Sequence, residues 1–358
     1  MVETNILFRR VPNADTAVQA AQQLKSTVDP IGQLDRITIY VGASLHAATL
    51  LLLIYAFFNR KYAPIRAKNI LLTGLVLFAG IMVFVGDIAT NGHVELVGVW
   101  SKCKVWCLWF RVFFAYTFSA AIGIRTYALY RVFVQHQPYR GFGFYVPIIG
   151  MFALVLAFCL TTQFISDEKT VKYVPELEFC TYVWAFRGAC LGLLWVIWLV
   201  VFYFVFMIRN ITSSFNERIE SIVCCILALT IILFTTLMHT LHPEYPLNQS
   251  YRVANTFIDF CMCNVVIVVI LGYPCFQCIF NRERYLEDWT AKLRADGLKK
   301  EYKVSTNTRS NTYPYAAMDD GDDEFQKSPA FWAARASSCQ SIRTGTGWAR
   351  MLNLQLAA

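Results

Sequence analysis

Seven long apolar segments constrain the fold of this chain more than any other feature. Each has about twenty residues and few charges, the length that an α-helix needs to cross about 30 Å of hydrocarbon. Charged residues make up only 16% of the 358 residues, against about 25% in a typical soluble domain. The sequence therefore predicts an all-α membrane protein, a seven-transmembrane helix bundle, and excludes a soluble enzyme. The segments are residues 37–58, 70–90, 106–130, 145–165, 188–208, 221–241 and 253–274.

All connections between the apolar segments are short, so consecutive helices are expected to be neighbours in the bundle. Polar sequence is concentrated at the two ends of the chain. We therefore expect four parts: an extracellular N-terminal segment (1–36), the bundle (37–274), an amphipathic interfacial helix (275–300) and a disordered cytoplasmic tail (301–358).

The interfacial helix is predicted from its pattern of apolar residues. Leu286, Trp289 and Leu293 share one helical face and basic residues crowd the rest, as in a helix that lies on an anionic inner leaflet. The tail that follows is rich in Ser, Thr, Asp and Gly and lacks the periodicity of a packed core, which favours disorder.

The distribution of basic residues predicts the orientation in the membrane. The first loop, residues 59–69, contains four bases and no acid, and further bases follow the third, fifth and seventh segments. Positive loops remain on the cytoplasmic side. We therefore expect a multi-pass protein of the plasma membrane with its N-terminus outside and its C-terminus in the cytoplasm. The bases are at loop ends and form no nucleic-acid-binding surface.

Two cysteines are placed for a disulfide on the outer side. Cys103 is at the start of the third segment and Cys180 is in the loop between the fourth and fifth. A bond between them in the oxidising compartment would hold that loop over the mouth of the bundle. Two alternatives stay open, because Cys107 is a competing partner one turn into the helix and both thiols could be free.

Ionisable residues inside the apolar segments indicate a polar site in the outer half of the bundle. Asp87, Arg111 and Asp259 are expected at similar depth, with His239 and Asn255 nearby. A lone charge in hydrocarbon is costly, so such groups pair or line a wet cavity. Either these residues form a ligand-binding pocket, or Arg111 makes an ion pair that only joins helices.

A second charged group is expected at the inner end of the bundle. Arg125, Tyr130 and Arg131 lie at the end of the third segment, and Glu217 or Glu220 begins the sixth. An ion pair of Arg125 with one of these acids would hold helix six inward and break when the helix swings out, which would give a two-state element for signalling. Alternatively, the pair is static and Arg131 extends to lipid phosphates.

The sequence also contains candidate residues for covalent modification and for metal binding. Cys275 and Cys278 are juxtamembrane positions suited to S-palmitoylation, and Asn248 begins an outer Asn-Gln-Ser glycosylation sequon. His239 and His242 could be zinc ligands. They would be about 30 Å from the two cysteines, so no metal site and no cofactor are expected.

Four segments, taken as one ordered set, carry a resemblance to a known family: NGHVELVGVWSKCKVWCLWFRVFF, RTYALYRVF, IRNITSSFNERIESIV and LGYPCFQCIFNRERYLEDWTAKLRADGL. Residues 37–300 resemble fungal seven-helix G-protein-coupled receptor-like proteins, particularly those related to receptors with a regulator-of-G-protein-signalling (RGS) domain. The resemblance implies a receptor that senses an extracellular ligand and activates a heterotrimeric G protein. The surface expected to contact the G protein is then formed by Arg125, Tyr130, Arg131 and Glu220. The resemblance also implies that Cys103 and Cys180 occupy the receptor disulfide positions and that Arg125 lies near the receptor arginine of helix three.

The sequence departs from the receptor pattern in three places. No acid precedes Arg125, helix seven ends in LGYPCF in place of an Asn-Pro-x-x-Tyr motif, and the tail has no recognisable RGS helices. No catalytic motif is present, so we expect no enzyme activity. The expected partners are a G protein, an extracellular ligand and membrane lipids.

Other functions of seven-helix proteins fit the sequence less well than a receptor does. The seventh segment has no lysine that could bind retinal. A small-solute transporter would show internal repeats and broken helices, which the sequence lacks, and it remains the alternative function beside a non-signalling seven-helix membrane protein.

Overall fold

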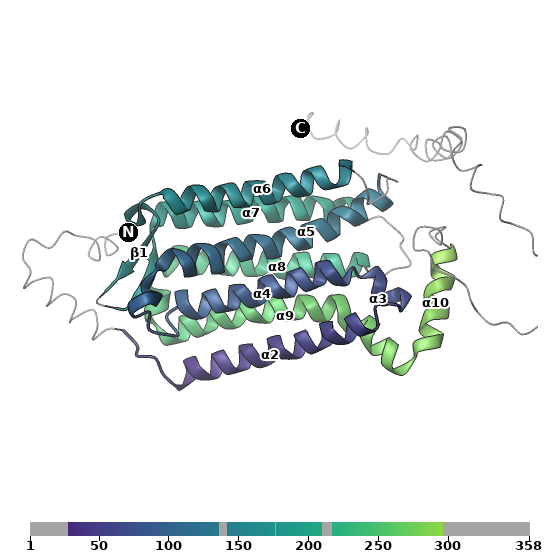
Figure 1. The fold of residues 1–358 in the computed structure, drawn as a ribbon, viewed down its shortest axis with the longest axis horizontal. Coiled ribbons are helices and arrows are strands. Elements are labelled where there is room, and N and C mark those ends of the chain that lie inside the picture. Colours follow the sequence, from purple (N-terminus) through teal and green to yellow (C-terminus); the bar gives the residue numbers. More distant parts are fainter. Residues whose placement is uncertain (1–27, 136–141, 176, 210–216, 296–358) are drawn as a thin grey trace, which may run out of the picture. The chain divides into compact units, whose positions relative to one another are not determined.

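The computed structural model describes residues 28–135, 142–175, 177–209 and 217–295. Within these ranges, seven helices are long and apolar enough to cross a membrane, which confirms the predicted seven-helix bundle. Figure 1 shows the helices running side by side. They are α2 (Gln33–Phe58), α4 (Ile70–Thr90), η3 (Val105–Phe113) continued by α5 (Phe114–Phe133), α6 (Phe142–Phe164), α7 (Trp184–Ile208), α8 (Glu217–Leu241) and α9 (Gln249–Phe280).

Several helices begin or end a few residues outside the apolar segments, because polar residues cap them. The Asp35 carboxylate accepts a hydrogen bond from the backbone N–H of Gly32 at the start of α2. Asn69 caps α4 by accepting from Leu72 N, and Asn248 caps α9. These side chains satisfy backbone donors that a helix start leaves without partners.

Short elements connect the long helices and mark the two ends of the bundle. One end, here called the hairpin end, carries the antiparallel strands β1 (Val171–Val174) and β2 (Phe179–Tyr182), with Val171 opposite Tyr182. The opposite end, here called the α10 end, carries α3 (Ala63–Ala67) and α10 (Arg282–Ala295). The remaining short helices are η2 (Gly98–Ser101), η4 (Asp167–Lys169) and η5 (Tyr245–Leu247).

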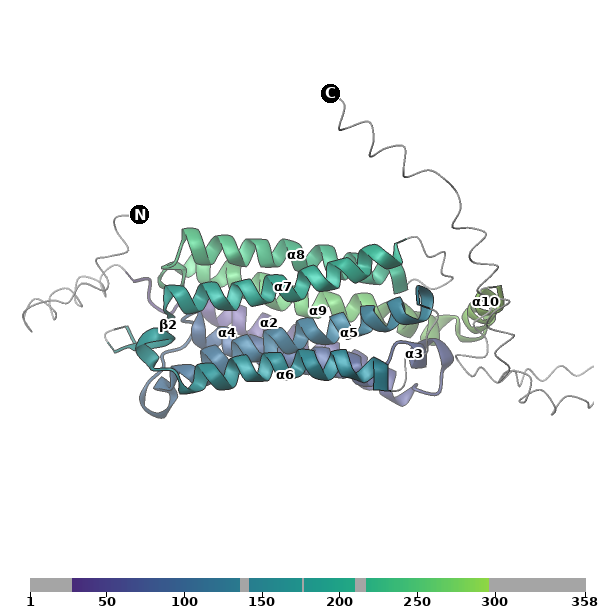
Figure 2. The same ribbon diagram turned by 90° about the horizontal axis from the view of Figure 1, so that it is seen from above.

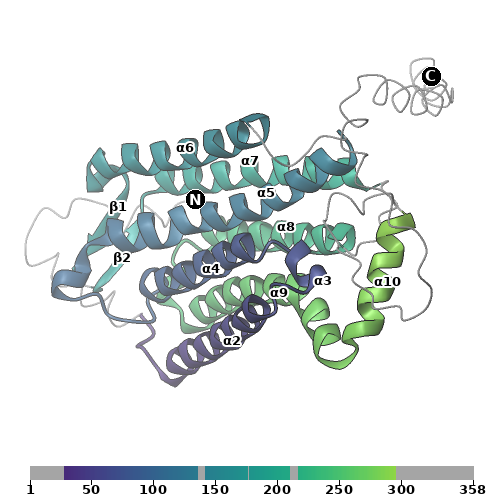
Figure 3. The same ribbon diagram turned by 45° about the vertical axis from the view of Figure 1, so that its right-hand side comes forward.

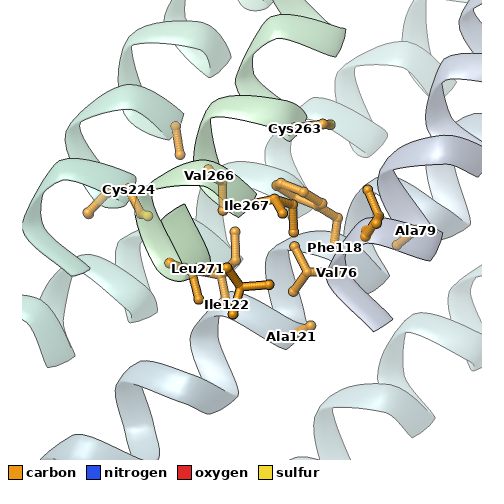
Figure 4. Packing of buried hydrophobic residues seen from close by; sticks show 14 of the residues in the cluster. Val76, Ala79, Phe118, Ala121, Ile122, Cys224, Cys263, Val266, Ile267 and Leu271 are labelled. Carbon is orange, nitrogen blue, oxygen red and sulfur yellow. The ribbon is translucent and has the colours of Figure 1, made fainter. Parts of the chain in front are cut away.

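Helix α5 occupies the middle of the bundle and packs on α4, α6 and α7, while α9 packs on α2, α4 and α8. Figures 1 and 2 show this arrangement from two directions, with α6 at the edge of the bundle. The central packing is apolar and comes from several helices: Val76, Phe118, Ile267 and Leu271 are fully or almost fully buried (Figure 4).

The outer surface of the bundle is also apolar. Leu71, Leu154, Val200 and Phe276 are exposed large hydrophobic side chains on four different helices. A soluble protein rarely leaves so many such residues uncovered, whereas a helix in lipid presents them to acyl chains. The chain is therefore a multi-pass membrane protein.

The predicted helix after the seventh span is present as α10, which Figure 3 shows crossing the end of the bundle near α3. The face that we expected to lie on lipid is turned to the protein. Trp289 is 6% exposed, and Leu286 packs on the central hydrophobic cluster, which contains Val76, Ile267 and Leu271. The side chain of Leu293, the tail beyond residue 300 and most of residues 1–36 lie outside the described residues.

Candidate functional site

A cavity of about 150 Å³ lies within the bundle toward the hairpin end. Residues of α4, η3, α5, β2, α7, α8 and α9 line it, so most of the helices contribute to its wall. One part of its wall is charged or polar and the rest is apolar. The charged and polar part includes Asp87, Arg111, Tyr182, Arg187, His239 and Asp259, and the apolar part includes Val83, Phe118, Leu194, Trp198, Ile231 and Met262.

Arg111 joins three helices at the polar part of the cavity. Its Nε lies 2.8 Å from Asp87 Oδ1 of α4, and its Nη2 lies 3.9 Å from Asp259 Oδ2 of α9. Its Nη1 donates to Asn91 Oδ1 at 2.7 Å and to the Tyr245 hydroxyl at 3.2 Å. A buried guanidinium with two carboxylates and further acceptors is well satisfied, and loss of one partner from such a group is costly.

The position of Arg111 depends on a close approach between α4 and η3. A Cβ on Gly86 would lie 2.8 Å from the backbone nitrogen of Arg111, which is too close for any side chain. The segment around Arg111 is a π-helix turn, and π-bulges are frequent at functional sites. Glycine at position 86 therefore allows the Asp87–Arg111 contact to form.

The five predicted ligand-binding residues do not all reach the cavity. Asp87, Arg111, His239 and Asp259 line it. Asn255 is fully buried outside the lining, and its Nδ2 contacts Asp259 Oδ2 at 3.5 Å. Asn255 can therefore orient Asp259 but does not itself face the cavity.

The Cys103–Cys180 disulfide is present, with a Cα–Cα distance of 5.5 Å, and Cys107 is a free, buried thiol. The bond ties the start of helix three to β2, which also carries Tyr182. The Tyr182 hydroxyl donates to the Cys107 carbonyl. The hairpin that closes this end of the cavity is thus held by both a covalent bond and a hydrogen bond, and the sequence did not indicate its two strands.

A second polar group at the hairpin end was missed by the sequence analysis. Arg252 of α9 contacts both carboxylate oxygens of Asp35, at 2.8 and 2.7 Å. His93 Nδ1 also contacts Asp35 Oδ1 at 2.8 Å, and His93 Nε2 contacts Thr256 Oγ1 at 2.8 Å. All these side chains are buried, and Asp35 and Arg252 are 217 residues apart.

The two polar groups are continuous with each other through Asn91 and Thr256. Asn91 Nδ2 donates to Thr256 Oγ1, and its Oδ1 accepts from Arg111. Burial raises the pKa of Tyr245, which keeps its proton and donates to Asn91 Oδ1. Burial lowers the pKa of His93, against the opposing effect of Asp35. The histidine is therefore neutral, with Nδ1 donating to Asp35 and Nε2 accepting from Thr256.

A separate ion-pair cluster lies near the α10 end. Glu220 of α8 accepts from two cations: Lys68 Nζ at 2.6 Å and Arg125 Nη2 at 2.9 Å. Lys68 is also 3.7 Å from Glu217. The expected pair of Arg125 with an acid of helix six thus forms with Glu220, and Lys68, at the α3–α4 junction, is an additional partner that sequence reasoning did not identify.

The other two residues expected at the coupling surface are more enclosed than predicted. Arg131 is 9% exposed and its Nη1 donates to the Gly143 carbonyl at 2.6 Å, so it joins the ends of α5 and α6 and does not extend freely toward phosphates. Tyr130 packs its ring 5.3 Å from that of Phe204.

The predicted lipidation of Cys275 and Cys278 does not fit the structure. Helix α9 continues to Phe280, and the two thiols are 1% and 5% exposed within the central cluster. An acyl transferase needs an accessible thiol, so these cysteines are core residues. The error came from ending helix seven at Pro274, whereas α9 continues through this proline.

Asn248, the predicted glycosylation position, is exposed and stands at the N-cap of α9. Its Oδ1 accepts from Ser250 N and Tyr251 N. The sequence has a second sequon, Asn-Ile-Thr, which begins at Asn210 and lies outside the described residues. Within the described ranges, no group of three or more His, Cys, Asp and Glu side chains is placed to hold a metal ion.

Comparison with known proteins adds a family to this geometry. The family model described as "7 transmembrane sweet-taste receptor of 3 GCPR" matches residues 32–252, more than half of the chain and most of its seven helices. A search of curated proteins finds no significant match. The chain belongs to this family of seven-transmembrane G-protein-coupled receptors.

Proposed function

We propose that this protein senses an extracellular ligand in the cavity and activates a heterotrimeric G protein at the α10 end. In this proposal the hairpin end faces the outside of the plasma membrane and the α10 end faces the cytoplasm. The disulfide supports this orientation because disulfides persist in oxidising compartments, and the basic first loop supports it through the positive-inside rule. Kinship with fungal RGS-related receptors is part of the same proposal.

The observation that carries the proposal is the position of Glu220. It binds Arg125 of α5 and Lys68 of the α3–α4 junction, so the start of α8 is held against two other elements. An outward movement of α8 would break both ion pairs and expose Arg125. Such an element has two discrete states, as a ligand-driven switch requires.

The cavity and the ion-pair cluster of Glu220 are connected because the same helices carry residues of both. Helix α8 carries His239 at the cavity and Glu220 at the cluster, and η3 with α5 carries Arg111 and Arg125. A ligand that binds more tightly to one arrangement of these helices shifts the population toward it. The Arg125 side chain would then be available to Gα.

The test is guanine-nucleotide exchange on the host's Gα subunits by the full chain reconstituted in nanodiscs. We expect measurable basal exchange, loss of this exchange in Arg125→Ala, and retention of it in a chain that ends at residue 305. Lys61→Ala, an exposed base at the same end of the bundle, is the charge-matched control and should keep wild-type exchange.

Two results would reject the proposal. If Arg125→Ala folds, reaches the plasma membrane and keeps full exchange, the cluster is a structural contact. If removal of the tail alone abolishes exchange, the output is in the tail and not at the helices. Thermal unfolding of each variant separates loss of coupling from loss of folding.

A further inference from the structure

Arg187 is a cavity residue that has no ion-pair partner among the described residues. It stands in the first turn of α7, is half-buried and lines the cavity. Among the described residues, no carboxylate lies within 4.0 Å of its guanidinium, and Glu244 acts on it only from a longer distance. Arg111, by contrast, already has Asp87 and Asp259. Arg187 therefore brings to the cavity wall a positive charge that no carboxylate of the described residues contacts.

His239, on the neighbouring helix α8, also has unused hydrogen-bonding capacity. Its side chain lines the cavity and is 6% exposed, and its Nδ1 has no hydrogen-bond partner among the described residues. Its ring contacts those of Tyr182 and Tyr245 edge to face, at 6.3 and 5.0 Å. A buried ring nitrogen without a partner is unfavourable, and a ligand that accepts a hydrogen bond from it would relieve this.

The electrostatic surroundings of His239 favour an anion. The positively charged guanidinium groups of Arg111 and Arg187 are both close enough to act electrostatically on its ring. The tyrosine hydroxyls on either side are already used, since Tyr182 donates to the Cys107 carbonyl and Tyr245 donates to Asn91. The groups that remain available to a ligand are the guanidinium of Arg187 and the imidazole N–H of His239, which together can donate hydrogen bonds to a carboxylate.

The rest of the cavity is apolar and small. Leu194, Trp198, Ile231 and Met262 form its wall away from the charged residues. A volume of about 150 Å³ is enough for a ligand about the size of benzene. A bound molecule would thus place an apolar body among these side chains.

We propose that the cavity binds a small organic carboxylate, with its carboxylate on Arg187 and His239 and its apolar body against Trp198 and Ile231. The inference deepens the proposed function by giving the chemical class of the ligand. Arg187 is then a specificity-determining residue, because a guanidinium and an imidazole N–H distinguish a carboxylate from a neutral molecule of the same shape.

The test measures binding to the full chain in nanodiscs without G protein, by calorimetry and by the shift in unfolding temperature. The probes are benzoate and hexanoate, each compared with its neutral amide, benzamide and hexanamide. We expect each carboxylate to bind at least tenfold more tightly than its amide. In Arg187→Gln this preference should disappear, and Arg187→Lys should retain part of it.

Arg36→Gln, which removes an exposed arginine at the hairpin end, is the matched control and should leave the preference unchanged. The inference is rejected if neither carboxylate binds, if acid and amide bind equally to the wild type, or if Arg187→Gln keeps the preference. The acid–amide comparison in the wild type needs no variant, so a folding defect in Arg187→Gln does not prevent a decision.

These experiments distinguish failure of the ligand assignment from failure of the proposed function. Carboxylate binding without any effect on nucleotide exchange would contradict the proposed function and support the ligand assignment. Exchange that is stimulated by the amides and not by the carboxylates would support the proposed function and contradict the ligand assignment.

Discussion

Arg125 Nη2 lies 2.9 Å from Glu220 Oε2, and this contact joins α5 to the first turn of α8. The other oxygen of the same carboxylate contacts Lys68 Nζ at 2.6 Å. Since one acid serves two cations, movement of α8 must break both contacts in one step. An equilibrium between a paired and an open state is therefore sensitive to a single carboxylate.

Replacement of Glu220 by Gln should activate the receptor. The amide removes the charge that holds Lys68 and Arg125 while it keeps the size of the side chain. We expect basal nucleotide exchange on Gα to rise by about fivefold or more, the lower range of typical allosteric coupling. Glu283→Gln, an exposed acid of α10, is the control and should leave exchange unchanged.

The double variant Glu220→Gln/Arg125→Ala distinguishes release of Arg125 from a general loosening of α8. If Arg125 itself contacts Gα, the double variant should have no exchange, like Arg125→Ala alone. Exchange that stays high in the double variant would show that Arg125 acts only as a restraint.

The buried His93 should make stability depend on pH. Burial lowers the pKa of His93 in the folded protein, whereas an unfolded histidine has a pKa of about 6.5. The unfolded chain therefore binds the proton more readily, and stability present above about pH 6.5 is lost as the pH falls. The slope contributed by one histidine is at most about 1.4 kcal/mol per pH unit.

Thermal unfolding between pH 5 and 7.5 checks the role of His93. His93→Gln should reduce the loss of unfolding temperature at acid pH, because glutamine cannot take up a proton. His242→Gln serves as the comparison, since the His242 ring stacks on that of Tyr251 and takes no part in the contacts of Asp35 with His93 and Arg252. Identical pH profiles for the wild type and His93→Gln would contradict the assignment.

The sequence identified the charged residues that stand alone inside apolar segments. Asp87, Arg111 and Asp259 were recognisable because a charge in hydrocarbon needs a partner, and the structure brings the three together. The same reasoning could not find the Asp35–Arg252 pair. Both residues stand near helix ends, where charges usually face water or headgroups, and only the packing of α2 on α9 brings them together.

The end of helix seven was also predicted incorrectly from the sequence. The seventh apolar segment was predicted to end at Pro274, with the interfacial helix beginning at Cys275. Helices in membranes tolerate proline when neighbouring groups satisfy the backbone, and α9 continues to Phe280. This difference alone moved Cys275 and Cys278 from an accessible segment into the core.

Removal of the Cys103–Cys180 bond should destabilise the hairpin end. Cys103→Ser frees the loop that carries Tyr182 from the start of helix three. Loss of a native disulfide costs about 2–5 kcal/mol in small secreted domains, which is an upper guide for a helix bundle. We expect a lower unfolding temperature and weaker ligand binding, measured beside Cys261→Ser, a free and half-buried thiol. Equal unfolding temperatures for the two variants would show that the bond adds no stability.

Gly86→Ala should impair the cavity without introducing any charge. A Cβ at this position would meet the backbone of Arg111 at 2.8 Å, so α4 and η3 must separate. The ion pair of Arg111 with Asp87 would then lengthen, and burial of a poorly paired charge is costly. We expect lower thermal stability and loss of ligand-dependent exchange.

Gly150→Ala is the matched control for Gly86→Ala. Gly150 is an exposed glycine of α6, and a Cβ there would have no heavy atom within 4 Å. Alanine favours a helix over glycine by about 1 kcal/mol in soluble hosts, so this variant should be as stable as the wild type or more stable. If the two glycine variants behave alike, the approach of α4 to η3 does not position Arg111, and the cavity must depend on other contacts.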